Sequence, residues 1–309
     1  MTATKMRFDS DLIDYGSADH LEILPDPVRP AVASPGPSRR RPGRTALAVF
    51  IWFVIGFLVW CILLSALPYA RHQQGLDRRL RSELSQGLTP VNQPIAAGSP
   101  IARIQIGAVG LDATVVEGSE ARQLVSGPGH LRTSVLPGQT GVSVLLGRRV
   151  TNGAPFRRIN ELQPGDRIRV TNGQGRWKYR VVRTRTVPAT DASAFVATGN
   201  TLLLVTAERT AFGPGRLVVT ARADGDLAQT GTRTQRGPAT ASELGLQGDA
   251  TGFAGLLVWL QVLVLAAAGA IVLQRRWGRW PAWLLAAPVL GASLWAMYEY
   301  LALLLPASF

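Results

Sequence analysis

The sequence predicts an all-β domain held outside a membrane by three transmembrane α-helices. Three observations lead to this prediction. Three long segments are apolar and almost free of charge, the polar segment between the first two contains short runs rich in Val, Ile, Leu and Thr, and Gly, Pro and Asn separate those runs. With 47% hydrophobic residues and a mean hydropathy of +0.14, the chain is too apolar for a soluble domain alone and too polar for a membrane bundle alone.

Three segments are long enough to cross a bilayer. The first predicted span is 46–70, which contains the uncharged run Ala46–Tyr69, and the second and third are 253–273 and 283–305. The first run is too long for the apolar core of a cleavable signal peptide, so we expect an uncleaved anchor.

Basic residues orient these spans. Residues 1–45 are rich in Pro, Ser and charge and end in an arginine cluster, so they are predicted to be a disordered cytoplasmic tail. The turn 274–282 holds three arginines, and short basic loops lie on the cytoplasmic side. The segment between the first two spans is then extracytoplasmic, and the protein is a multi-pass cell-membrane protein. The arginine cluster at 71–81 favours the inverted orientation, which stays an alternative.

The polar segment divides into one domain and two tethers. Residues 71–100 and 222–252 are predicted linkers, the second of them disordered, and 101–221 is the right size for one domain. Its clearest hairpin spans 166–186 and turns at 172–175, with alternating apolar and polar side chains in its second strand. A β-barrel or β-sandwich follows.

Composition excludes several classes of function. The net charge is +13, but the arginines lie beside the spans or are scattered over the β domain, so we expect no nucleic-acid partner. The single cysteine, Cys61, lies in the first predicted span and rules out an intramolecular disulfide or a Cys-based metal site. We expect no cofactor and no metal.

Four segments carry a resemblance to a known family. They are 107–118, 126–141 with its GPGH and LPGQ motifs, 144–170 with GAPFRRI and LQPGD, and 202–219. In order and spacing they resemble actinobacterial sortases, especially the class E type. The resemblance implies a closed β-barrel of about eight strands, a membrane-anchored domain facing the cell wall, and cysteine transpeptidation. In that reaction a C-terminal sorting signal is cleaved, a thioacyl intermediate forms, and its acyl group is transferred to a cell-wall amine.

The resemblance breaks at the reacting groups. Sortase chemistry uses a cysteine thiolate, a histidine and an arginine. By the resemblance, Ala207 stands at the cysteine position, Arg148 at the histidine position and Arg216 at the arginine position. A methyl group cannot attack a carbonyl, and a guanidinium with a pKa above about 12 cannot act as a general base at neutral pH. His130, in the GPGH motif, is predicted to be structural.

Two interpretations of the altered site stay open. Arg148 and Arg216 could favour an anion between them, so that both, with Glu208, are ligand-binding candidates for an acidic group. Alternatively, Arg148 pairs with Glu208 and the site is a neutralised remnant.

The predicted function is therefore that of a pseudoenzyme, a cell-surface binding or scaffolding component. Its expected partners are the membrane and a sorting-signal peptide, a wall precursor or an active sortase. One alternative is a sortase-type enzyme with a non-cysteine nucleophile, such as Thr206 or Ser143. The other is a membrane partner protein whose spans are the functional part, with the intramembrane polar residues Glu299 and Gln261 facing each other or a partner protein.

Overall fold

A computed structural model of the protein describes residues 42–87, 95–208, 215–230, 242–244, 249 and 252–305. The predicted cytoplasmic tail therefore lies almost wholly outside the described residues, as do parts of both predicted linkers. The chain divides into two compact units, Met1–Ala48 and Val49–Phe309, and the barrel and most of the helical part belong to the second.

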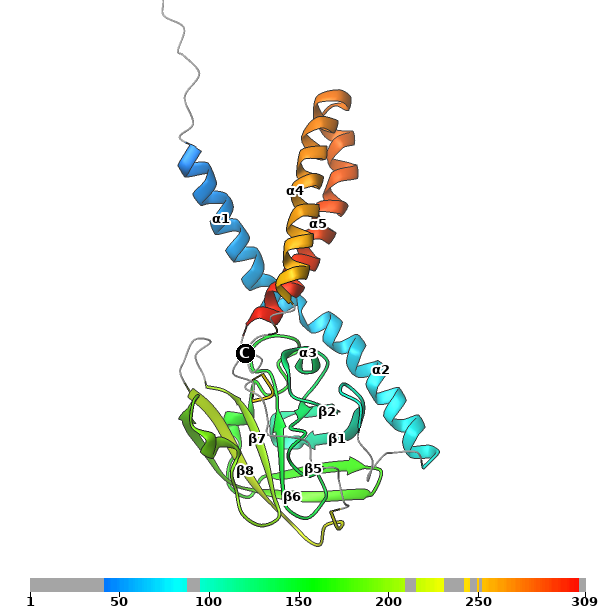
Figure 1. Cartoon of the computed structure of the whole chain (residues 1–309), viewed down its shortest axis with the longest axis vertical. Helices are drawn as coiled ribbons and strands as arrows, with labels where there is room; N and C mark the ends of the chain where they lie inside the picture. The colour runs from blue at the N-terminus through cyan, green and yellow to red at the C-terminus, as the bar shows by residue number, and fades with distance from the viewer. Residues whose placement is uncertain are drawn as a thin grey trace, which may run out of the picture. The chain divides into compact units, whose positions relative to one another are not determined.

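Eight strands close into a barrel in the order β1-β2-β3-β4-β7-β8-β6-β5 (Figure 1). The strands are β1 Pro100–Ile106, β2 Leu111–Glu117, β3 Gly129–His130, β4 Val142–Leu146, β5 Arg167–Asn172, β6 Gly175–Pro188, β7 Thr201–Ala207 and β8 Gly215–Ala223. β2 pairs with β3 and β4 with β7 in parallel, and the other neighbours are antiparallel. The predicted closed all-β barrel is confirmed.

Alternation of side chains builds the barrel core. On β6, Tyr179 and Val181 are buried, whereas the intervening Lys178 and Arg180 are exposed. β7 is buried on both faces, because Leu202 and Leu204 belong to the main apolar core while Leu203 and Val205 belong to a second apolar cluster, and its sequence is therefore a continuous apolar run. Two-residue β3 has no such pattern, and the sequence did not predict it.

Helices account for the rest of the described chain. They are α1 Pro42–Val59, a π-helical turn Trp60–Leu64, α2 Ala66–Ser85, α3 Ala121–Leu124, α4 Gly252–Trp277 and α5 Arg279–Leu304, with 3₁₀ turns at Gly107–Val109, Ile159–Glu161 and Ala192–Phe195. Three helical stretches are long and apolar enough to cross a membrane, namely Phe50–Ser85, Gly252–Trp277 and Arg279–Leu304. They overlap the three predicted spans.

α2 occupies much of the segment that the sequence predicts as a linker. Its polar composition suggested a tether, but one face carries Leu80, which is 1% exposed, and Gln73. The Gln73 amide donates to the carbonyl of Thr114 at 3.1 Å and accepts from the N–H of Thr114 at 2.7 Å, so it binds α2 to strand β2. An i,i+4 pair of Asp77 with Arg81 at 2.6 Å supports the outer face.

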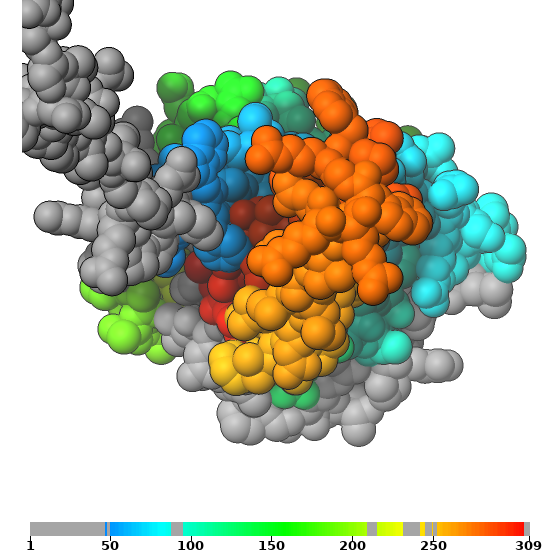
Figure 2. Space-filling view, turned by 90° about the horizontal axis from the view of Figure 1, so that it is seen from above, coloured from blue at the N-terminus to red at the C-terminus, as the bar shows by residue number. Residues whose placement is uncertain are grey.

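The apolar helices meet next to the barrel. α4 and α5 form a hairpin, and the hydroxyl of Tyr298 on α5 donates to the carbonyl of Phe53 on α1 at 3.0 Å. Figure 2 shows the red end of α5 between blue α1 and orange α4. At the end of the first span, the Ser65 hydroxyl accepts from the N–H of Asn152 in a barrel loop at 3.0 Å. The first span is thus joined to the barrel at its loops.

Candidate functional site

The three positions of the altered site lie on neighbouring strand ends. β4 and β7 are parallel, so their carboxyl ends meet at one edge, and β8 begins at that edge because it runs antiparallel to β7. The N–H of Gly147 donates to the carbonyl of Val205 at 3.1 Å, and Ala207 lies directly opposite Arg216. The fold therefore brings together the backbone positions that the sequence selected.

Arg216 is a buried cation with an unused donor. It is 3% exposed, and its guanidinium lies 4.7 Å from the centre of the Phe195 ring. Burial lowers the pKa of Arg216 to about 10, which leaves the side chain charged at neutral pH. Its Nη2 has no hydrogen-bond partner within the part of the chain that the structure describes. A buried guanidinium nitrogen without an acceptor is a site for an anionic oxygen.

Arg148 lies in a different environment from Arg216. It is completely buried, and it donates to Thr151 Oγ1 at 2.9 Å and to the carbonyl of Ala121 in α3 at 3.0 Å. Burial lowers the pKa of Arg148 to about 10, and the nearby Cys61 acts in the opposite direction. Across the described ranges no ion pair joins Arg148 to Glu208, so the expected internal pair is not formed.

Arg149 is the side chain that reaches Ala207. Its Nη1 donates to the carbonyl of Ala207 at 2.9 Å and its Nη2 to Asn160 Oδ1 at 3.0 Å. Sequence reasoning missed this residue because the resemblance selected its neighbour. Arg148 donates to Thr151 and Ala121, so of the two adjacent arginines it is Arg149 that bonds to β7. The presence of two consecutive arginines after Gly147 was the feature of the sequence that could have identified Arg149.

Glu208 lies against the start of β8. Its N–H donates to the carbonyl of Gly215 at 2.9 Å, and a Cβ at Gly215 would lie 1.9 Å from Glu208 Oε2. Glycine is therefore required at position 215 for the carboxylate to occupy this place. The site thus combines a carboxylate at the end of β7 with the guanidinium that begins β8.

Two hydroxyl groups near the site have no hydrogen bond to a basic group among the described residues. Thr206 Oγ1 donates to the carbonyl of Gly147 at 2.7 Å, and Ser143 is buried with no hydrogen-bond partner for its Oγ among the described residues. A hydroxyl nucleophile needs a base within hydrogen-bond reach. Both ring nitrogens of His130 are engaged, one with Glu117 Oε2 and one with the carbonyl of Val135, each at 2.8 Å.

The membrane-side candidates lie elsewhere in the structure. Glu299 accepts from the indole N–H of Trp295 at 2.7 Å, one turn earlier on α5. It also lines a cavity of about 490 Å³ together with Arg122 and His72. Gln261 is exposed on α4, and the predicted contact of Glu299 with Gln261 or with a partner protein stays a prediction. Within the described ranges, no group of three His, Cys, Asp or Glu side chains is placed to hold a metal ion.

Comparison with known proteins shows what the barrel is similar to. Residues 104–224 match the sortase domain family. Sortase D of Bacillus subtilis (strain 168) is 36% identical over 90 residues, which cover 29% of this chain and 44% of that protein. The chain thus matches less than half of that relative's length.

Two solved structures are also similar. A Sortase D5 transpeptidase of Clostridium perfringens shares 25% identity at a TM-score of 0.43, covering 51% of this chain and 99% of that one. Sortase E from Streptomyces avermitilis shares 26% identity at a TM-score of 0.39, covering 42% of this chain and 91% of that one.

Proposed function

We propose that the domain at 104–224, which matches the sortase domain family, is a membrane-anchored receptor that binds an anionic ligand at the altered site without cleaving it. The ligand class is a peptide terminus or a wall precursor that presents a carboxylate or phosphate group. The apolar helices hold the domain at the extracytoplasmic face of the cell membrane, in the orientation that the basic residues indicate.

One observation carries the proposal: Ala207 ends β7 directly opposite Arg216, with no thiol or imidazole joined to either by a contact in the described residues. The carbonyl of Ala207 is bonded to Arg149, a group that is cationic at neutral pH. Arg148, at the position of the family's histidine, stays protonated at neutral pH because its pKa is about 10. Neither arginine can accept a proton from an attacking group.

Arg216 supplies the binding group. Its charge persists at neutral pH, its Nη2 lacks an acceptor within the described residues, and Phe195 holds the guanidinium plane. A carboxylate or phosphate oxygen would satisfy this donor with a charge-assisted hydrogen bond. Glu208, at the end of β7, would repel anions that approach from its side and so restrict the orientation of the ligand.

The absence of transfer chemistry is tested with the full chain in detergent. Incubation with a sorting-signal peptide and an amine acceptor is expected to give neither a ligated product nor an acyl adduct by intact mass, with an active sortase as the positive control. Ligation by the wild-type chain would show that another residue performs the reaction.

Binding is tested with the same peptide by fluorescence anisotropy. Arg216→Met keeps the packing against Phe195 but removes the charge, and we expect at least about tenfold weaker binding. Arg222→Met, an exposed arginine farther along β8, is the matched control and should bind as the wild type does. Equal affinity of all three proteins would eliminate Arg216 as the binding group.

A further inference from the structure

The outer face of the β5–β6 hairpin is made almost entirely of cations. Alternation along the two strands turns Ile168, Val170 and Tyr179 into the barrel and the intervening residues outward. We call the outward cations the basic face: Arg167, Arg169, Arg176, Lys178 and Arg180.

Strand register places like charges directly opposite each other on this face. Arg169 pairs with Lys178 and Arg167 with Arg180. Like charges at directly opposed positions destabilise a sheet. The Arg167 and Arg180 pair is relieved because Arg180 binds Asp224 at 2.9 Å. Arg169 and Lys178 have no ion pair in the described part of the chain, so no acid there relieves their repulsion.

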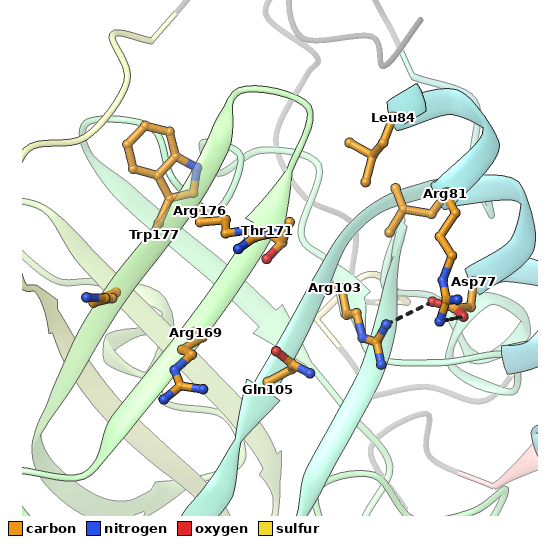
Figure 3. A pocket seen from close by; sticks show the side chains of 11 residues that line it. Asp77, Arg81, Leu84, Arg103, Gln105, Arg169, Thr171, Arg176 and Trp177 are labelled. Atoms are coloured by element: carbon orange, nitrogen blue, oxygen red, sulfur yellow. Dashed lines mark hydrogen bonds and ion pairs between the residues drawn. The ribbon is translucent and has the colours of Figure 1, made fainter. Parts of the chain in front are cut away.

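A groove continues from this face toward α2. Its volume is about 600 Å³, and Figure 3 shows Arg169 and Arg176 on its hairpin side and Arg81 on its helix side. The acids beside the groove are already bound to arginines. Asp77 contacts Arg81 at 2.6 Å and Arg103 at 3.4 Å, and Asp112 contacts Arg103 at 2.7 Å. The remaining cations of the groove are therefore not neutralised by these acids.

We propose that the basic face and this groove bind a linear polymer of phosphate groups. Cations two residues apart on a strand are about 6.8 Å apart, and the opposed cation lies about 5 Å away across the ladder. A phosphate has oxygens that point in different directions, so one group can bridge Arg169 and Lys178 and relieve their repulsion. A planar carboxylate matches the fork of a single guanidinium better than it matches an opposed pair.

Two other polyanions fit less well. A nucleic acid that binds as a single strand needs exposed aromatic side chains for base stacking. Tyr179 is buried, and Trp177 is the one aromatic side chain that lines the groove; it is partly buried against the core with its indole N–H bonded to Asn172 Oδ1, and the outward side chains of the basic face are cations. A lipid surface fits less well because the groove is lined by the far end of α2. Arg81 is about 22 Å along the helix axis from Ala66, where α2 begins.

The test measures binding of long-chain inorganic polyphosphate to the full chain in detergent over a series of salt concentrations. Arg169→Thr with Lys178→Thr is expected to bind at least about tenfold more weakly, with a salt dependence that reports about two fewer contacts. Arg71→Thr with Arg157→Thr removes the same charge from exposed positions that have no ion pair in the described residues, and it should bind as the wild type does.

A single variant separates binding from folding. Lys178→Glu replaces the repulsion with Arg169 by an ion pair, so we expect a higher Tm together with weaker polyphosphate binding. A lower Tm, or unchanged binding, would overturn the proposal.

Three further outcomes would overturn it as well. Equal loss in the control variant would mean that net charge alone drives binding. If polyglutamate, or mixed micelles of an anionic phospholipid, bind as tightly as polyphosphate, the basic face binds a carboxylate polymer or a lipid instead. Single-stranded DNA binding tenfold more tightly per phosphate would indicate base recognition.

Discussion

Thr206→Val is expected to destabilise the barrel while leaving its binding function intact. The Thr206 hydroxyl is completely buried and donates to the carbonyl of Gly147 at 2.7 Å, which joins the end of β7 to the segment that follows β4. Valine has nearly the same shape and a comparable preference for strands, so packing is retained and only the hydrogen bond is lost.

The expected loss of stability follows from the environment of the Gly147 carbonyl. Removal of one buried partner costs about 1 to 3 kcal/mol, because the remaining group has lost its water without gaining a replacement. A loss of about 2 kcal/mol corresponds to roughly a 30-fold change in the unfolding equilibrium. Thr171→Val is the matched control, because Thr171 lies on the outer face of β5 with no hydrogen bond from its hydroxyl in the described chain. Its expected effect is within about 0.5 kcal/mol.

The assay is a urea series on the full chain in detergent, read by hydrogen–deuterium exchange of the β7 peptide. This readout reports on the barrel strand itself and not on the apolar helices. The reasoning fails if Thr206→Val is as stable as the wild type. A different failure is a stable Thr206→Val protein that loses a covalent reaction with peptide, because the hydroxyl would then be a nucleophile.

Three further perturbations test the packing beside the site. Burial raises the pKa of Tyr179 to about 12, so the phenol ionises more easily in the unfolded chain and the wild type should lose stability as pH rises from 10 toward 12. Tyr179→Phe should therefore show a smaller fall in Tm between pH values of about 9 and 11. Gly138 has φ of +99° and a Cβ there would meet the Trp177 ring at 2.2 Å, so Gly138→Ala should lower the unfolding free energy by about 2 kcal/mol or more in urea, and a neutral result would contradict the close approach. His130→Ala removes the ring partner of the buried Glu117 carboxylate and should cost about 3 kcal/mol by thermal unfolding, whereas a loss below about 1 kcal/mol would argue against a tightly held pair.

Local patterns in the sequence were enough to predict the longer strands and three apolar helices. Uncharged apolar runs and period-2 alternation are written into consecutive residues, so the 166–186 hairpin and the β7–β8 pair were predicted and are confirmed by β5, β6, β7 and β8. The identity of residue 207, an alanine, is likewise read directly from the sequence.

The helix α2 shows what local composition misses. Its residues are polar enough for a linker, but α2 packs against β1 and β2, Leu80 is buried, and Gln73 bonds to the backbone of Thr114 on β2, which is distant in the sequence. Most helical stability in proteins comes from such tertiary packing.

By itself, the sequence determined which residue types stand at the strand ends: Ala207 and Arg148 occupy the positions where the resemblance to sortases implies a cysteine and a histidine. Only the tertiary structure decided which arginine reaches Ala207, that Arg148 is bound to α3 and Thr151, and that Arg169 faces Lys178. The physical reason is that side-chain direction and cross-strand register depend on how distant segments pack, and neighbouring residues do not encode them.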